Sequence, residues 1–185
     1  MKKLLILNQN NPIVSSLIPL LHQNPDIDYQ IFSGNPELAG DYIKALRDVD
    51  WIFSALGPND VDLDFEELFD AIDEVQPPIS HFVMLSAAGV DDELVSPINY
   101  PGVKDQAEFL KQQRYAIKIV DESELPYTII RLSKLSENDS LDYKLFNEGI
   151  KMPNATVSSR AVAKLVLEVF QSNQLVNRSV GVING

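Results

Sequence analysis

Short apolar runs alternate with amphipathic segments along almost the whole chain. The runs are too short for helices and nearly continuous, as expected for strands buried on both faces of a parallel sheet. Strands are predicted at 3–7, 29–32, 50–56, 81–85, 127–131 and 179–183. Apolar residues that recur every three or four positions predict helices at 12–22, 36–48, 65–75, 104–122 and 157–171. Strands separated by helices form βαβ units. We therefore expect one Rossmann-type, doubly wound α/β domain over residues 1–185, with a mainly parallel sheet of five to six strands and helices on both faces.

The charge balance and the rare residue types exclude several classes of function. With 27 acidic and 15 basic side chains, the formal net charge is −12, which would repel the phosphates of nucleic acids and anionic membranes. The chain has no cysteine and only two histidines, His22 and His81. Disulfides, thiolate metal sites and a histidine metal cage are thereby excluded. We expect no metal site and no nucleic-acid partner.

The N-terminus imitates the start of a signal peptide, with Met-Lys-Lys followed by the apolar residues 4–7. The apolar run stops at Asn8, whereas a signal peptide needs roughly 7–15 apolar residues. No run approaches the roughly 20 apolar residues of a membrane span. The run is therefore predicted to be the first strand, and the protein is expected in the cytoplasm with no membrane partner.

In an open parallel sheet, ligands bind outside the carboxyl ends of the strands. The segments that follow the predicted strands are 8–11, 33–35, 55–59, 86–89 and 132–136. A functional site is therefore expected in these segments.

Four segments, taken together, resemble one protein family. They are 50–57 (DWIFSALG), 81–90 (HFVMLSAAGV), 122–131 (ESELPYTIIR) and 157–163 (VSSRAVA). Their order and spacing resemble those of the atypical short-chain dehydrogenases/reductases, in particular the NmrA-like, NAD(P)H-binding and flavin reductase-like members. The resemblance spans nearly the whole chain. It implies binding of NAD or NADP and transfer of a hydride to a small flat acceptor such as a flavin or a quinone.

The glycine fingerprint of that family is missing. Asn8, Asn11 and Val14 stand at its three glycine positions. Asparagine tolerates a left-handed backbone better than most residues, so Asn8 and Asn11 are expected to adopt it. Val14 is expected to push the first helix from the sheet or to narrow the phosphate site, which implies a weakened or remodelled cofactor site.

The resemblance implies a role for residues at each strand end. The pyrophosphate would lie near Asn10–Ile13, the adenosine beside 55–57, and the nicotinamide toward Ser86 and Leu132. Ser33 takes the place of the arginine that binds the 2′-phosphate of NADP in many members, so the choice between NAD and NADP stays open. The implied cofactor-binding residues are Asn8, Asn10, Asn11, Pro12, Ile13, Ser33, Ala55, Leu56, Gly57, Ser86, Ala87 and Leu132.

The resemblance also implies candidate catalytic residues. Ser86 ends a predicted strand where related enzymes place a serine that contacts substrate, although a serine that bonds its own turn would look the same. Tyr100 and Lys104 have the spacing of a Tyr-x-x-x-Lys pair, in which the lysine lowers the pKa of a tyrosine acting as general acid. Pro101 and Gly102 would interrupt a helix between them, so a loop tyrosine and a solvated lysine are the alternative.

Acidic clusters at 60–67 and 91–93 are predicted to be solvated. The first lacks the residue spacing of a calcium loop and suits the start of a helix. Arg131 is expected to pair with a carboxylate under the loops. Residues 133–154 correspond to the substrate lid of the family and are short, so a shallow or open substrate pocket is expected.

Two functional hypotheses remain open from the sequence. The first is an NAD(P)-dependent oxidoreductase with a small-molecule acceptor. The second is a non-catalytic, degenerate Rossmann module that acts as a nucleotide sensor or as a protein-interaction domain, which the loss of the three glycines favours.

Overall fold

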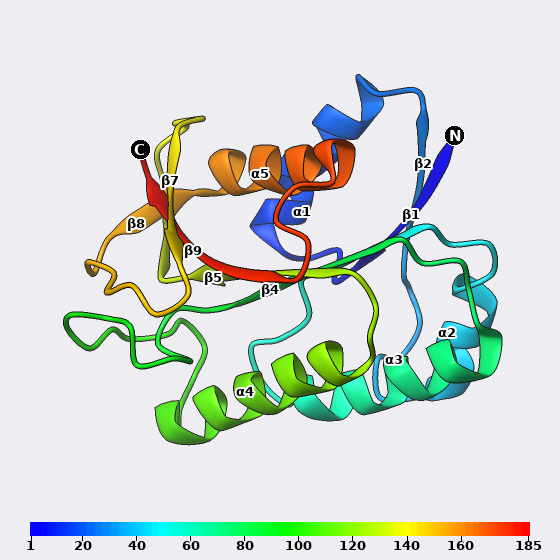
Figure 1. The fold of residues 1–185 in the computed structure, drawn as a ribbon, viewed down its shortest axis with the longest axis horizontal. Coiled ribbons are helices and arrows are strands. Elements are labelled where there is room, and N and C mark those ends of the chain that lie inside the picture. Colours follow the sequence, from blue (N-terminus) through cyan, green and yellow to red (C-terminus); the bar gives the residue numbers. More distant parts are fainter.

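The protein has a main sheet of mostly parallel strands covered by helices on both faces, as described by a computed structural model of residues 1–185 (Figure 1). The strands are β1 (Lys2–Leu7), β2 (Ile27–Ile31), β3 (Trp51–Ser54), β4 (His81–Ala87), β5 (Tyr127–Leu132), β6 (Lys134–Ser136), β7 (Tyr143–Asn147), β8 (Thr156–Ser158) and β9 (Arg178–Asn184). The helices are α1 (Pro12–His22), α2 (Ala39–Ala45), α3 (Val61–Val75), α4 (Gln106–Glu122) and α5 (Ser159–Ser172).

The main sheet has seven strands in the order β2-β1-β3-β4-β5-β9-β7. All neighbours are parallel except β7, which runs antiparallel to β9. The chain leaves β1 to form β2 on one side and returns to form β3 on the other. The order of the strands therefore reverses at β1 and β3, which is where a doubly wound sheet opens a crevice for ligands.

The predicted fold class is confirmed, but the predicted number of strands is too low. The main sheet gains β7, and β6 pairs with β8 in a separate two-stranded sheet. These three short strands lie in or next to a polar segment, where only Leu145 and Phe146 suggested burial. The partners of β7 and β6 lie on β9 and β8, far along the chain, so local pattern gave no signal for them.

Two apolar cores, one on each face, hold the helices against the sheet. Helices α1 and α5 cover one face, and α2, α3 and α4 cover the other (Figure 1). Within β1, Leu4 and Ile6 enter the first core while Leu5 and Leu7 enter the second. This alternation explains why the strand is apolar throughout.

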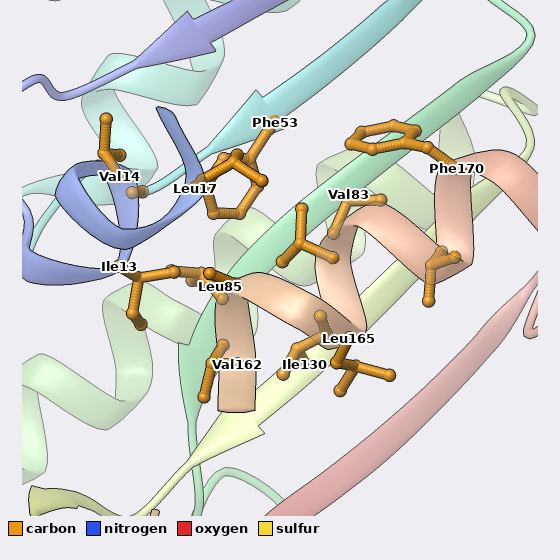
Figure 2. Packing of buried hydrophobic residues seen from close by; sticks show 14 of the residues in the cluster. Ile13, Val14, Leu17, Phe53, Val83, Leu85, Ile130, Val162, Leu165 and Phe170 are labelled. Carbon is orange, nitrogen blue, oxygen red and sulfur yellow. The ribbon is translucent and has the colours of Figure 1, made fainter. Parts of the chain in front are cut away.

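Val14 lies in the apolar core. It is 1% exposed and belongs to the core between α1, α5 and the sheet, together with Ile13 and Leu17 (Figure 2). The valine therefore takes part in helix–sheet packing, at a position where the resemblance implies a glycine.

Helix boundaries differ from the prediction at several ends. Helix α3 begins at Val61, four residues before the predicted start, whereas α4 begins at Gln106 and leaves Lys104 outside the helix. No helix is long and apolar enough to cross a membrane.

Candidate functional site

A cavity of about 290 Å³ opens at the carboxyl ends of β3, β4 and β5, at the edge of the sheet that the topology indicates. Half of its lining residues are apolar. The connection before α4, α4 itself and the start of β6 complete the wall beside the strand ends. The lining residues are Asn11, Ala55, Leu56, Gly57, Pro58, Leu85, Ser86, Ala87, Tyr100, Pro101, Phe109, Gln113, Leu132, Ser133, Lys134 and Leu135. We call this space the acceptor cavity, after the ligand proposed for it below.

A second cavity, of about 320 Å³, lies on the other side of the reversal point. Its residues come from the ends of β1 and β2 and from the first turn of α3. They are Asn8, Gln9, Asn10, Phe32, Ser33, Gly34, Pro36, Leu56, Gly57, Asn59 and Asp64. We call it the adenosine cavity. Leu56 and Gly57 line both cavities, so the two adjoin across the end of β3.

Gly57 has no side chain at this shared wall and has a φ of +121°. Other residues rarely adopt that backbone conformation. The glycine therefore fixes the turn after β3 and leaves backbone alone between the cavities.

Asn8 has a φ of 74°, so the expected left-handed backbone is present at the first fingerprint position. Its side-chain Nδ2 donates to the carbonyl of Ala55 at 2.7 Å, and its Oδ1 accepts from the Asn10 amide at 3.3 Å. The asparagine therefore reproduces the tight turn and adds a link between β1 and β3 that glycine would not make.

Asn11 is extended, with φ −86° and ψ 134°, so the expectation of a left-handed backbone there is wrong. The reason is the following Pro12, which disfavours helical backbone at the preceding residue. Asn11 instead caps α1: its Oδ1 accepts from the Ile13 amide at 2.8 Å. Since Pro12 has no N–H, the first two residues of α1 have no free amide for a phosphate in this conformation.

Ser86 and Gln113 form a buried polar pair in the acceptor cavity. The Ser86 hydroxyl donates to Gln113 Oε1 at 2.9 Å, and the two residues are 7% and 3% exposed. The bond fixes the orientation of the amide, and Gln113 Nε2 lies 3.8 Å from the position of a Cβ built on Gly57. The Nε2 donates to no group of the protein, so the pair presents a fixed hydrogen-bond donor beside the wall shared by the cavities.

Gln113 was missed from the sequence, although a signal existed. Phe109, Ala116 and Val120 are buried on one face of α4, and Gln113 falls on the same face. A polar residue in an apolar stripe requires a partner, because burying an unpaired amide costs free energy. Phe109 and Leu135 were also missed, since loop and helix residues reach the cavity only through the tertiary fold.

Tyr100 and Lys104 both lie in the connection before α4. The Tyr100 hydroxyl donates to the Ala88 carbonyl at 2.5 Å. Burial, with the charge of Glu93, raises the pKa of Tyr100 to about 12. Lys104 is exposed and lines neither cavity. The arrangement therefore lacks the shared helical face on which a lysine lowers the pKa of a tyrosine.

Two of the acidic residues predicted to be solvated are buried. Glu93 is 3% exposed and forms an ion pair with Arg131, which is 0% exposed. Glu93 also accepts from the Gly89 amide, and Arg131 Nε donates to Ser179 Oγ at 2.9 Å. The expected pairing of Arg131 with a carboxylate is thus confirmed. The buried Glu93 carboxylate is the partner that the buried charge of Arg131 requires.

Asp64, the second exception, is 7% exposed and lines the adenosine cavity. Burial, with the nearby charges of Glu37, Asp60 and Asp62, raises the pKa of Asp64 to about 6. The carboxylate accepts no hydrogen bond from the protein. It is therefore available to a ligand in that cavity.

The fold brings most of the predicted site residues to one edge of the sheet. The acceptor cavity gathers Asn11, Ala55, Leu56, Gly57, Ser86, Ala87, Tyr100 and Leu132. The adenosine cavity gathers Asn8, Asn10 and Ser33. Pro12, Ile13 and Lys104 line neither, and Ile13 is fully buried in the core.

Solved structures with this architecture cover almost the full length of the chain. A short-chain dehydrogenases/reductase from Veillonella parvula DSM 2008 in complex with NADP has a TM-score of 0.84 at 21% identity, covering 99% of this chain and 94% of that one. A Rossmann-fold NAD(P)-binding family protein from Shigella flexneri has a TM-score of 0.80 at 20% identity, covering 100% and 96%. The anaerobillin reductase ChuY from Escherichia coli O157:H7 has a TM-score of 0.78 at 15% identity, covering 99% and 97%. At these identities the likeness shows the fold.

The search of curated proteins gave no match. A family described as NAD(P)H-binding matches residues 20–173. The matched region begins after the first loop and contains β2 to α5, so it excludes the residues at which the fingerprint is altered. The match covers well over half of the sequence, and the chain belongs to the NAD(P)H-binding family.

Proposed function

We propose that this protein is an NAD(P)H-dependent oxidoreductase that reduces a small flat acceptor, such as a flavin or a quinone. The observation that carries the proposal is the Ser86–Gln113 pair, which holds a free amide donor in the acceptor cavity. The Nε2 group has no acceptor in the protein and borders the cavity, so a ligand there can supply its acceptor. Family membership and the position of the cavity at the carboxyl ends of the strands support the same conclusion.

The residues of the two cavities offer groups that suit the two ends of a dinucleotide. Asn8, Ser33 and Asp64 offer polar groups for a ribose in the adenosine cavity, and Gly57 keeps the boundary free of a side chain. Ser86, Gln113 and Leu132 would hold the nicotinamide end. Bound there, the reduced cofactor supplies a hydride, and the protein orients the partners.

The pyrophosphate is the part for which the protein must adjust. Asn11 Oδ1 accepts a hydrogen bond from the Ile13 amide, which is a group of the kind that binds phosphate at a helix N-terminus. A rotation of the Asn11 side chain would release that amide. The cost of losing the cap, about 1 kcal/mol, would weaken binding without abolishing it.

The state of Tyr100 favours an acceptor that needs no strong acid from the protein. Its raised pKa and its bond to the Ala88 carbonyl make it a poor proton donor. Flavins and quinones take a hydride onto a conjugated ring and their proton from water. Tyr100 and the neighbouring Phe109, whose ring centroids lie 4.8 Å apart, would instead offer apolar surface to a flat ring.

A titration tests the proposal directly. NADH and NADPH are titrated separately into the protein by calorimetry, and oxidation of the bound form is followed with FMN, FAD and a soluble quinone. The expected result is micromolar binding and turnover with at least one acceptor. Gln113→Leu should weaken binding, while Lys111→Ala, exposed on the same helix, should leave it unchanged. Absence of binding at millimolar concentrations would overturn the proposal.

Two observations favour the non-catalytic alternative, a nucleotide sensor. The capped first turn of α1 and the buried Val14 both depart from a catalytic fingerprint. Tight dinucleotide binding with no turnover of any acceptor would select that alternative.

A further inference from the structure

The adenosine cavity carries negative charge and no positive charge. Among its lining residues Asp64 is the one ionisable side chain, and no lysine, arginine or histidine is present. A phosphate placed there would meet a carboxylate and no cation. Phosphate sites in proteins use arginine, lysine or free backbone amides.

Asp64 differs from the other acids of the 60–67 cluster because it is buried. It is 7% exposed, so it is more than nine-tenths buried, and it faces the cavity without a hydrogen bond or an ion pair from the protein. Its charged neighbours Glu37, Asp60 and Asp62 are all acidic. Burial of most of the side chain disfavours its charged form, and a ligand hydroxyl that donates to the carboxylate would offset that cost.

The position of the cavity indicates which ligand hydroxyl would donate to Asp64. The cavity lies between the ends of β1 and β2, at Asn8 and Ser33, where a Rossmann domain receives the adenosine ribose. The acid reaches this place from α3 rather than from the end of β2, where Ser33 stands.

We propose that Asp64 makes this protein select NADH over NADPH, by accepting hydrogen bonds from the adenosine ribose and repelling a 2′-phosphate. The inference rests on the proposed function. It adds the choice of cofactor and the residue responsible for it.

A third cavity adjoins the adenosine cavity and contains a lysine. It shares Phe32, Ser33 and Gly34 with the adenosine cavity and contains Lys44 together with Asp41. Asp41 offsets the charge of Lys44, and its carboxylate already accepts from the Asn35 amide at 2.8 Å. The two cavities together therefore remain net negative.

The test measures the dissociation constants of NADH and NADPH for four proteins at pH 7.5. These are the wild type, Asp64→Asn, Asp70→Asn and Lys44→Ala. Asp70 is an exposed acid on the same helix, so its substitution makes the same change in net charge away from the cavity.

The wild type should bind NADH at least about tenfold more tightly than NADPH. Asp64→Asn should reduce this ratio about fivefold or more, mainly by tightening NADPH binding, while Asp70→Asn and Lys44→Ala leave it unchanged. A wild type that binds NADPH as tightly as NADH overturns the inference but not the proposed function. A selective loss of NADPH binding in Lys44→Ala would also overturn the inference and leave the proposed function standing. A protein that binds neither overturns both.

Discussion

The side-chain amide of Asn8 donates a 2.7 Å hydrogen bond to the carbonyl of Ala55 and so joins the ends of β1 and β3. These are the two strands at which the order of the sheet reverses. The asparagine therefore connects the two cavities' walls at the point where a ligand would cross from one to the other.

This bond predicts a graded response to substitution at Asn8. Asn8→Ala loses the bond and puts a residue that tolerates the left-handed backbone less well than asparagine at this position, so it should lower the free energy of unfolding by about 2 kcal/mol. Asn8→Gly loses the bond but relieves the backbone, so its loss should be about 1 kcal/mol. Urea unfolding measures both. Equal losses would contradict a role for the φ of 74°.

Asn11 is predicted to compete with the cofactor for the Ile13 amide. Asn11→Gly removes the competing oxygen, and glycine at an N-cap costs only a few tenths of a kcal/mol. We expect NADH affinity to rise about three- to tenfold, as the energy of one hydrogen bond implies. Calorimetric titration of the variant measures the change. Unchanged or weaker binding would contradict this competition.

Tyr100 and Lys104 are predicted not to act as a catalytic pair. Lys104→Ala should leave kcat unchanged, because the side chain is exposed and lines neither cavity. Tyr100→Phe should change the KM for the acceptor more than kcat, since the hydroxyl bonds the Ala88 carbonyl. Steady-state kinetics with the best acceptor decide the question. A loss of about 10²–10⁴ in kcat from either substitution would restore the general-acid role.

His81 is predicted to make the fold acid-sensitive. It is 1% exposed, and burial lowers its pKa to about 4. The Thr128 hydroxyl donates to the Leu175 carbonyl, so His81 Nε2–H is the donor in the 2.8 Å bond between them, and Nδ1 has no partner. Because the folded-state pKa is depressed, stability is full above pH 6.5 and falls as pH drops toward 4, by about 2–3 kcal/mol.

Denaturant unfolding between pH 4 and 7 tests this prediction. His81→Gln retains a donor toward Thr128 and should remove the dependence. His22→Gln, at an exposed position, should retain it. Parallel pH profiles of the wild type and His81→Gln would contradict the assignment.

Asp64 is predicted to act in the opposite direction over the same range. Its pKa is raised to about 6, so the fold favours the protonated carboxyl, and stability falls as pH rises from about 4 to 6. Because the group lines an open cavity, solvent screens its charge, and the loss of stability should be about 1–2 kcal/mol. Asp64→Asn should therefore be more stable than the wild type at pH 7.5 and equal to it near pH 4. Asp70→Asn provides the control, and a destabilised Asp64→Asn at pH 7.5 would refute the prediction.

The order of the main elements was predictable because burial on both faces leaves a strong local mark. Each of the central strands is a continuous apolar run, and α1 and α5 show one apolar face each. Strand β7 left no such mark, since Tyr143 and Lys144 at its start are only partly buried or exposed. Its existence depends on β9, which lies more than 30 residues further on.

The polar parts of the site were harder to predict, because their partners are distant in sequence. Glu93 stands in a run of three acids that is typical of a solvated turn, and only its contact with Arg131 explains its burial. The extended conformation of Asn11 follows from the next residue, Pro12, so this part of the site has a local cause in the sequence.

The ion pair between Glu93 and Arg131 also bears on how an acceptor is admitted. Glu93 holds the Gly89 amide, and Gly89 lies under Tyr100 so closely that a Cβ there would collide with the tyrosine hydroxyl. One side of the acceptor cavity is thus fastened to the sheet from below. An acceptor bound as proposed would therefore be selected by its shape against a rigid surface rather than by induced fit.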